Sequence, residues 1–150
     1  MKLENKIALI TGGSRGIGRG IALGFAREGA DVIVNYCSNE ERAREVVASV
    51  SESGRKSRAI RADMGDMEQV ASLVEEAWDA FGRIDILVNN AGIAYFESFL
   101  DLRFDQWRRV LAVNLDGVML CSQLVARKMV AAGIRGKIIK KTFFSISSLC

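Results

Sequence analysis

The stretch KIALITGGSRGIG, residues 6 to 18, decides the fold because an apolar run passes directly into a glycine-rich turn. Lys6–Ile10 predicts a short buried strand. Apolar residues at helical spacing follow over Ile17–Ala26, and Gly29 marks the end of that helix. Asp31–Tyr36 then predicts a second strand, so the unit has the size of about thirty residues that is typical of a parallel crossover.

The glycine-rich turn has residue types that suit a bound phosphate. Gly12, Gly16 and Gly18 lack side chains, so backbone N–H groups at the start of the helix can approach a pyrophosphate. Ser14 and Ile17 lie in the same turn and are further candidate contacts. Glycine-rich turns between a strand and a helix also occur for packing alone. The strand, turn and helix around this one favour phosphate binding.

Strands and helices alternate along the rest of the chain. Apolar periodicity predicts helices at residues 40–50, 67–81 and 105–132, the last interrupted near Asn114. Further strands are predicted at residues 57–61, 84–88 and 137–148. This order with short connections predicts an α/β fold of the Rossmann type, a doubly wound parallel sheet in a single domain over residues 1–150.

Composition excludes several other classes of protein. The chain has 150 residues, 49% hydrophobic and 26% charged, and we expect no apolar stretch long enough to span a bilayer. Its net charge of +3 is scattered, which disfavours nucleic-acid binding. Histidine is absent and Cys37, Cys121 and Cys150 have no metal-site spacing, so no metal is expected. The N-terminus lacks the pattern of a signal peptide, which predicts a reducing, cytoplasmic setting.

Two further motifs accompany the turn. Asn89-Asn90-Ala91-Gly92 closes a second apolar run, and Asn114 lies inside an apolar helix. With these motifs the chain resembles the classical short-chain dehydrogenase/reductase family from about Lys6 to Gly136, and resembles sugar dehydrogenases and acyl-carrier-protein ketoreductases most at residues 7–18. The family's sheet is longer, and this chain accounts only for its first five strands. The resemblance also implies a homotetrameric parent protein.

The resemblance implies that the glycine-rich turn holds a nicotinamide dinucleotide, and Arg15 indicates which one. Family members with a basic residue here generally use NADP, because a guanidinium can hold the 2′-phosphate; a solvated surface charge is the alternative reading. Members selective for NAD carry an acidic residue at the end of the second strand, where this chain reads Asn35-Tyr36-Cys37-Ser38. NADP is therefore the expected cofactor, with NAD as the second choice. Ser38 either donates to the phosphate or caps the next helix.

The resemblance also assigns the adenine end of the cofactor. Asp63 follows the third predicted strand, where family members accept a hydrogen bond from the adenine amino group. Met64 would offer backbone contacts beside it. Capping of the following helix is the competing role for Asp63, although Asp66 is better placed for that purpose.

The remaining implied contacts lie toward the nicotinamide end. Three residues would lie beside the cofactor ribose: Asn90, Ala91 and Gly92. Asn114 matches the asparagine whose backbone carbonyl, exposed by a helix kink, holds a water of the proton relay; a satisfied polar residue within a helix is the alternative. Ser148, with Ser147 as a fallback, matches the serine that bonds the carbonyl or hydroxyl of a small-molecule substrate. Asn114 and Ser148 are thus the expected catalytic residues.

One family motif is missing from the printed sequence. Tyr36 and Tyr95, the only tyrosines, are followed four residues later by Glu40 and Phe99, so no Tyr-x-x-x-Lys is present. We therefore expect a truncated, inactive chain that carries the cofactor half of an NADP(H)-dependent oxidoreductase acting between a carbonyl and a secondary alcohol. A catalytically inactive nucleotide-binding module and a fragment without function are the alternatives.

The end of the chain departs from the family pattern as well. Residues 140–145 separate Ile139 from Ile146, where family members have one polar residue. Lys140 and Lys141 are costly in a strand that is buried on both faces. We expect the fifth strand to be shifted or bulged, or a surface loop to precede a displaced strand at residues 143–147.

Overall fold

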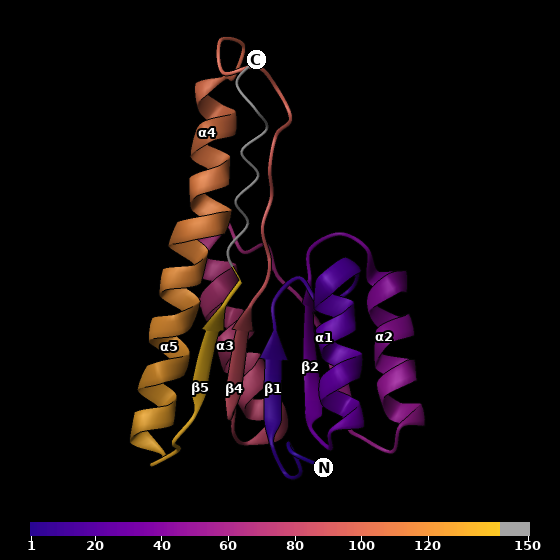
Figure 1. Ribbon diagram of the computed structural model, residues 1–150. Helices are drawn as coiled ribbons and strands as arrows, with labels where there is room; N and C mark the ends of the chain where they lie inside the picture. Colours follow the sequence, from indigo (N-terminus) through magenta and orange to yellow (C-terminus); the bar gives the residue numbers. More distant parts are fainter. Residues whose placement is uncertain (142–150) are drawn as a thin grey trace.

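The computed structural model describes residues 1–141 and consists of one parallel sheet between two layers of helices (Figure 1). In chain order the elements are β1 (Ile7–Ile10), α1 (Gly16–Arg27), β2 (Asp31–Tyr36), α2 (Glu40–Glu52), β3 (Ser57–Arg61), α3 (Met67–Phe81), β4 (Ile86–Asn89), α4 (Phe104–Leu111), the π-helical segment η1 (Ala112–Asp116), α5 (Gly117–Ala131) and β5 (Lys137–Lys140).

The five strands lie in the order β3-β2-β1-β4-β5, and every pair is parallel. The predicted doubly wound α/β fold of the Rossmann type is therefore confirmed. From β1 the chain passes to β2 and β3 on one side, and then crosses to β4 and β5 on the other side of β1, so the strand order reverses at β1. Connections that diverge in this way leave a crevice beyond the carboxyl ends of β1 and β4, which is where open α/β sheets bind ligands.

Alternate residues of each strand enter two separate core layers. Leu9, Ile33 and Leu87 pack with residues of α3 and α5 on one face. Ile10 and Val34 pack with α1 and α2 on the other. All five side chains are fully buried, as expected for central parallel strands covered on both faces.

Local capping signals fix the helix bounds where they are strong. The predicted helix over residues 67–81 is confirmed, because the Asp66 carboxylate accepts hydrogen bonds from the amides of Glu68 and Gln69 and Gly82 ends the helix with a φ of +74°. The second predicted helix extends two residues further, to Glu52. The predicted strand at residues 84–88 begins two residues later, at Ile86.

The segments α4, η1 and α5 form one continuous rod, which rises beyond the carboxyl edge of the sheet (Figure 1). The predicted interruption near Asn114 is confirmed as the π-helical segment. The expectation that no apolar stretch is long enough to span a bilayer is wrong. The rod, Phe104–Ala131, has 28 residues, and an 18-residue window within it has a mean hydropathy of 1.3, so it is long and apolar enough to cross a membrane. Part of this hydropathy comes from Cys121, Val125 and Met129, which lie in the core beneath α5, but only 22% of the window is buried. The absence of a membrane remains a prediction.

The expected shift of the fifth strand is wrong up to Lys140. β5 pairs with β4 in unbroken register, with Asn89 opposite Lys140. All four residues of β5 are exposed, so its lysines keep their contact with water. The alternative strand at residues 143–147 lies outside the described residues.

Candidate functional site

A cleft with a volume of about 550 Å³ opens beyond the carboxyl ends of β1, β2, β3 and β4. This is a size typical of ligand pockets. Its lining includes every predicted cofactor contact, namely Gly12, Ser14, Arg15, Gly16, Ile17, Gly18, Ser38, Asp63, Met64, Asn90, Ala91 and Gly92. The structure thus brings together residues from four separate parts of the chain.

The three glycines of the turn have different roles. A Cβ on Gly12, whose φ is +61°, would lie 2.9 Å from the Cα of Ala91. A Cβ on Gly18 would collide with the carbonyl oxygen of Gly12 and lie 2.5 Å from Nδ2 of Asn90. Gly16 also has a positive φ, +52°, but faces open space. Packing therefore requires glycine at two positions, and only Gly16 opens toward the space beyond the turn.

The first turn of α1 has no side-chain cap. Its N-cap residue, Arg15, has an extended backbone and makes no capping hydrogen bond. By contrast, Asn39 caps α2 and Asp66 caps α3 through their side chains. A helix N-terminus with uncapped amides at the wall of a cleft attracts an anion.

Asn35, which the sequence analysis gave no structural role, fixes the turn from β2. Its Oδ1 accepts a hydrogen bond from the amide of Gly12 at 3.2 Å, and its Nδ2 donates to the carbonyl of Ala62 at 3.0 Å. The side chain is buried, so both ends of the amide need partners. An amide can donate and accept at once, whereas the carboxylate of an aspartate could only accept.

Asn90 joins the ends of β4 and β1. Its Nδ2 donates to the carbonyls of Thr11 at 3.0 Å and Gly12 at 2.9 Å. The hydroxyl of Thr11 in turn accepts from the amides of Asn90 and Ala91. Asn89 instead turns toward α5, where its Nδ2 donates to the hydroxyl of Ser122.

The end of β2 leads to a second polar corner of the cleft. Ser38 lines it but does not cap α2, because Asn39 Oδ1 accepts the capping bond from the amide of Arg42 at 3.0 Å. The capping interpretation of Ser38 is therefore wrong. Arg15 and Arg42 also line the cleft. The sequence analysis did not predict Arg42 as a residue of the cleft, although its position in the first turn of α2, directly after β2, could have indicated it.

Asp63 lies just after β3 and forms an ion pair with Arg109, a partner that the sequence did not indicate. Arg109 Nη2 donates to both carboxylate oxygens, at 2.8 and 2.7 Å. The amide of Gly65 donates to Oδ1 at 2.8 Å. Asp63 does not cap α3, which leaves its carboxylate in the cleft wall.

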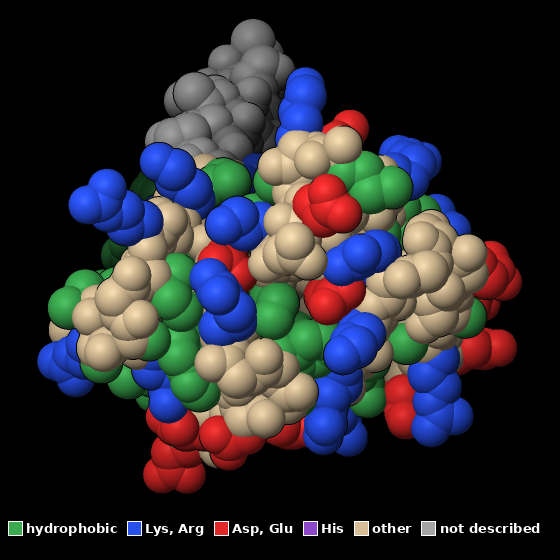
Figure 2. All heavy atoms as spheres, turned by 90° about the horizontal axis from the view of Figure 1, so that it is seen from below, with side chains coloured by type: hydrophobic (Ala, Val, Ile, Leu, Met, Phe, Trp, Pro, Cys, Tyr) green, Lys and Arg blue, Asp and Glu red, His purple; other side chains and the backbone are tan. Residues whose placement is uncertain are grey.

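The cleft is strongly cationic. Among residues 1–141, Arg15, Arg42, Arg109 and Lys141 line it and Asp63 is the only acidic residue that does, so four positive charges minus one negative charge give +3. Figure 2 shows the opposite end of the molecule, where cationic and anionic side chains are interspersed. A cleft with a net charge of this size favours an anionic ligand.

Asn114 lies within η1 and fastens the segment after β4. Its Oδ1 accepts from the amide of Ile93 at 2.9 Å, and its Nδ2 donates to the carbonyl of the same residue at 2.8 Å. A Cβ on Gly92 would lie 3.4 Å from Asn114 Oδ1. The side chain is therefore satisfied by these bonds, and the helix is π-helical at this position. A role for the backbone carbonyl of Asn114 in a proton relay remains a prediction. The other expected catalytic residue, Ser148, lies outside the described residues.

These features define the class of protein as a Rossmann-type domain with its cleft at the reversal of strand order. The sequence model of the short chain dehydrogenase family matches residues 6–147. The chain belongs to the short-chain dehydrogenase family.

Characterised relatives agree with this assignment. An L-rhamnose 1-dehydrogenase (NAD(P)(+)) of Sphingomonas is 40% identical and covers 98% of this chain and 57% of its own length. A 3-oxoacyl-[acyl-carrier-protein] reductase of Staphylococcus epidermidis is 42% identical, over 83% of this chain and 51% of the reductase. A short chain dehydrogenase of Burkholderia cenocepacia, solved in complex with NADP, superposes with a TM-score of 0.83 at 46% identity, covering 85% of this chain and 52% of that one. The chain spans about half the length of these relatives.

Proposed function

We propose that this chain binds NADP(H) and forms the cofactor half of an oxidoreductase that interconverts a carbonyl and a secondary alcohol. The observation that carries the proposal is the uncapped N-terminus of α1, which opens on a cleft of net charge +3. Relatives that are named for NADP or solved with it support the choice of cofactor.

The residues present fit the pyrophosphate and the adenosine end of this dinucleotide. The pyrophosphate would face the first turn of α1 at Gly16, where no atom fills the space of a side chain. The 2′-phosphate would lie among Arg15, Ser38 and Arg42, which can supply charged and hydroxyl donors. The adenine amino group would donate to the Asp63 carboxylate. When bound, the nicotinamide supplies or accepts the hydride.

The proton-transfer part of the reaction has no candidate in the printed sequence. Tyr36 is buried in β2, Tyr95 follows β4, and neither has a lysine four residues later. We therefore expect the 150 residues to bind cofactor without turnover, and Asn114 and Ser148 to act only with the missing tyrosine and lysine. A nucleotide-binding module without catalysis is the second candidate, and this missing motif is the observation that favours it.

The setting and assembly are further parts of the proposal. Cys37 and Cys121 are free thiols, which supports a reducing, cytoplasmic location. Exposed apolar side chains along the rod, including Trp107, Leu115 and Met119, support a homotetrameric parent.

The decisive experiment is a titration of the chain with NADPH and with NADH, read by cofactor fluorescence. NADPH should bind more tightly, and Arg15→Glu should weaken NADPH binding about tenfold or more, since a hydrogen bond to a charged group is lost. Arg19→Glu is the matched control because Arg19 is exposed on the same helix outside the cleft. Equal affinity of the unmodified chain for both cofactors would contradict the NADP assignment.

A second readout needs no fluorescence. Cys37 is exposed and lines the cleft, so bound NADPH should slow its alkylation as measured by peptide mass spectrometry. Cys121 is an internal reference, because burial raises the pKa of its thiol to about 12 and keeps it unreactive. Alkylation of Cys37 at an unchanged rate in saturating NADPH would place the ligand elsewhere.

A further inference from the structure

Asp63 and Arg109 form an ion pair in the wall of the cleft. The residues come from the end of β3 and from α4, and one guanidinium nitrogen, Nη2, lies 2.8 and 2.7 Å from the two carboxylate oxygens. The side chains are 27% and 38% exposed, so water screens the pair only in part. Both residues line the cleft.

Close packing holds the loop that carries Asp63 against the rod. A Cβ on Gly65 would collide with the Arg109 guanidinium and lie 2.9 Å from Cγ2 of Val113. On the other side of the contact, a Cβ on Gly117 would collide with the carbonyl oxygen of Met64. Glycines in both elements therefore permit the approach, and the packing fixes where the guanidinium can lie.

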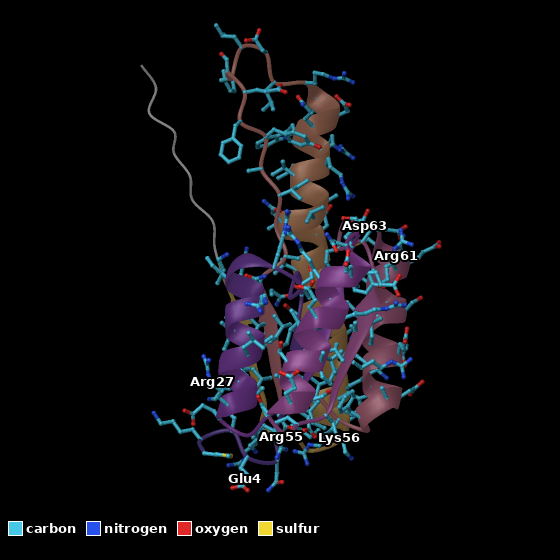
Figure 3. The ribbon with its side chains drawn as sticks, turned by 90° about the vertical axis from the view of Figure 1, so that its right-hand side faces the viewer. Glu4, Arg27, Arg55, Lys56, Arg61 and Asp63 are labelled. Carbon is cyan, nitrogen blue, oxygen red and sulfur yellow. The ribbon has the colours of Figure 1, made fainter. Side chains whose placement is uncertain are left out.

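The orientation of the carboxylate follows from its three hydrogen bonds. Oδ1 accepts from the Gly65 amide and from Arg109, and within the described part of the chain Oδ2 accepts from Arg109 alone. A carboxylate has about four lone-pair sites, so one site on Oδ2 remains for a further donor. Figure 3 shows Asp63 at the end of the sheet opposite to Glu4, Arg55 and Lys56, on the side where the rod passes.

We propose that Arg109 is a positioning residue of the cofactor cleft, which holds the Asp63 carboxylate in the orientation that receives the amino group of adenine. The proposal rests on the proposed function, because it assumes that a nicotinamide–adenine dinucleotide occupies the cleft. Without Arg109 the carboxylate keeps its charge but can rotate and be hydrated. Selectivity for the adenine amino group should then fall.

A plain structural brace between α4 and β3 is the competing explanation. Loss of a brace would lower stability and would weaken every ligand of the cleft by a similar factor. Loss of a positioning residue would weaken chiefly the ligand that carries a donor at the 6-position of the purine. The test therefore compares NADPH with nicotinamide hypoxanthine dinucleotide phosphate, in which an oxygen replaces that amino group.

The measurement is the ratio of the two dissociation constants in the full chain. The unmodified chain should prefer NADPH about tenfold, the value of one hydrogen bond to a charged group. Arg109→Met should reduce the preference to about twofold or less. Arg109→Lys should give an intermediate ratio because lysine keeps the positive charge but carries it on a more flexible ammonium than the planar guanidinium. Arg108→Met is the matched control, since Arg108 is exposed on the same helix and does not line the cleft, and should leave the ratio unchanged.

The outcomes separate the two proposals. Failure of the unmodified chain to bind either dinucleotide would overturn the proposed function itself. Binding of NADPH without preference, or a preference that survives Arg109→Met, would overturn the role of Arg109 alone. Circular dichroism checks that each variant is folded, and if Arg109→Met is not, Arg109→Lys and Asp63→Asn carry the same comparison.

Discussion

Replacing Gly18 by alanine should separate the packing role of the turn from the general preference of helices for alanine. Gly18 and Gly20 both lie in α1. A Cβ on Gly20 would meet no atom within 4 Å, whereas a Cβ on Gly18 would collide with the carbonyl of Gly12 and crowd the Asn90 amide. Gly20→Ala is therefore the matched control for Gly18→Ala.

The two variants should change stability in opposite directions. Alanine in place of glycine within a helix gains about 0.5–1 kcal/mol, which is the whole effect expected at Gly20. At Gly18 the same gain is outweighed by overpacking of about 1–3 kcal/mol and by the weakening of the Asn90 hydrogen bonds to Thr11 and Gly12, about 1 kcal/mol. The variants should thus differ by about 2–4 kcal/mol, or roughly 4–16 °C in Tm for a chain of this size.

Urea denaturation and thermal melts of both variants, with and without NADPH, provide the assay. Gly18→Ala should also bind NADPH more weakly, because the backbone of the turn must move, while Gly20→Ala should bind it unchanged. The packing argument is refuted if Gly18→Ala is as stable as Gly20→Ala.

Three further predictions concern polar groups that are buried or partly buried. Asp85→Ala should cost about 1–3 kcal/mol in urea denaturation, since the carboxylate accepts from the buried amide of Ile7; an unchanged midpoint would contradict this. Asn114→Ala should cost a similar amount through its two bonds to Ile93, and hydrogen exchange at the Ile93 amide should accelerate; unaltered exchange would count against it. Burial raises the pKa of Cys121 from 9.0 to about 12, so its contribution to stability is complete below pH 9 and is lost as the pH rises toward 12. By pH 10 the loss should be on the order of 1 kcal/mol, and Cys121→Ala should abolish that component of the pH slope; equal slopes would refute the linkage.

Short-range signals explain most of what the sequence predicted well. The helix over residues 67–81 has a capping aspartate before it and a glycine after it, and the structure confirms its bounds. The family resemblance implied that the glycine-rich turn and the asparagine motif contact the same cofactor. In the structure both line one cleft, because parallel strands carry their carboxyl ends to the same edge of the sheet. Family membership was also recognised from these motifs and is confirmed.

Most of the errors arose where distant parts of the chain meet. Arg109 and Asp63 are 46 residues apart, so no local pattern connects them. One error was local: Ser38 was offered as a phosphate donor or a helix cap, and its neighbour Asn39 proved to be the cap because the choice depends on backbone direction after β2. Lys140 was expected to disturb a buried strand, but the desolvation cost depends on coverage, and within residues 1–141 the strand is exposed.

The π-helical segment in the rod affects which side chains face the cleft and which face the core. Side chains spaced by four residues drift around an ideal α-helix by about 40° per step, because 3.6 residues complete a turn. Over the series Arg109, Val113, Gly117, Cys121, Val125 and Met129, such a drift would carry the first side chain well away from the side occupied by the last. The π-helical segment winds more slowly and so removes part of the accumulated rotation. The same stripe can therefore begin at the wall of the cleft and end in the core beneath α5.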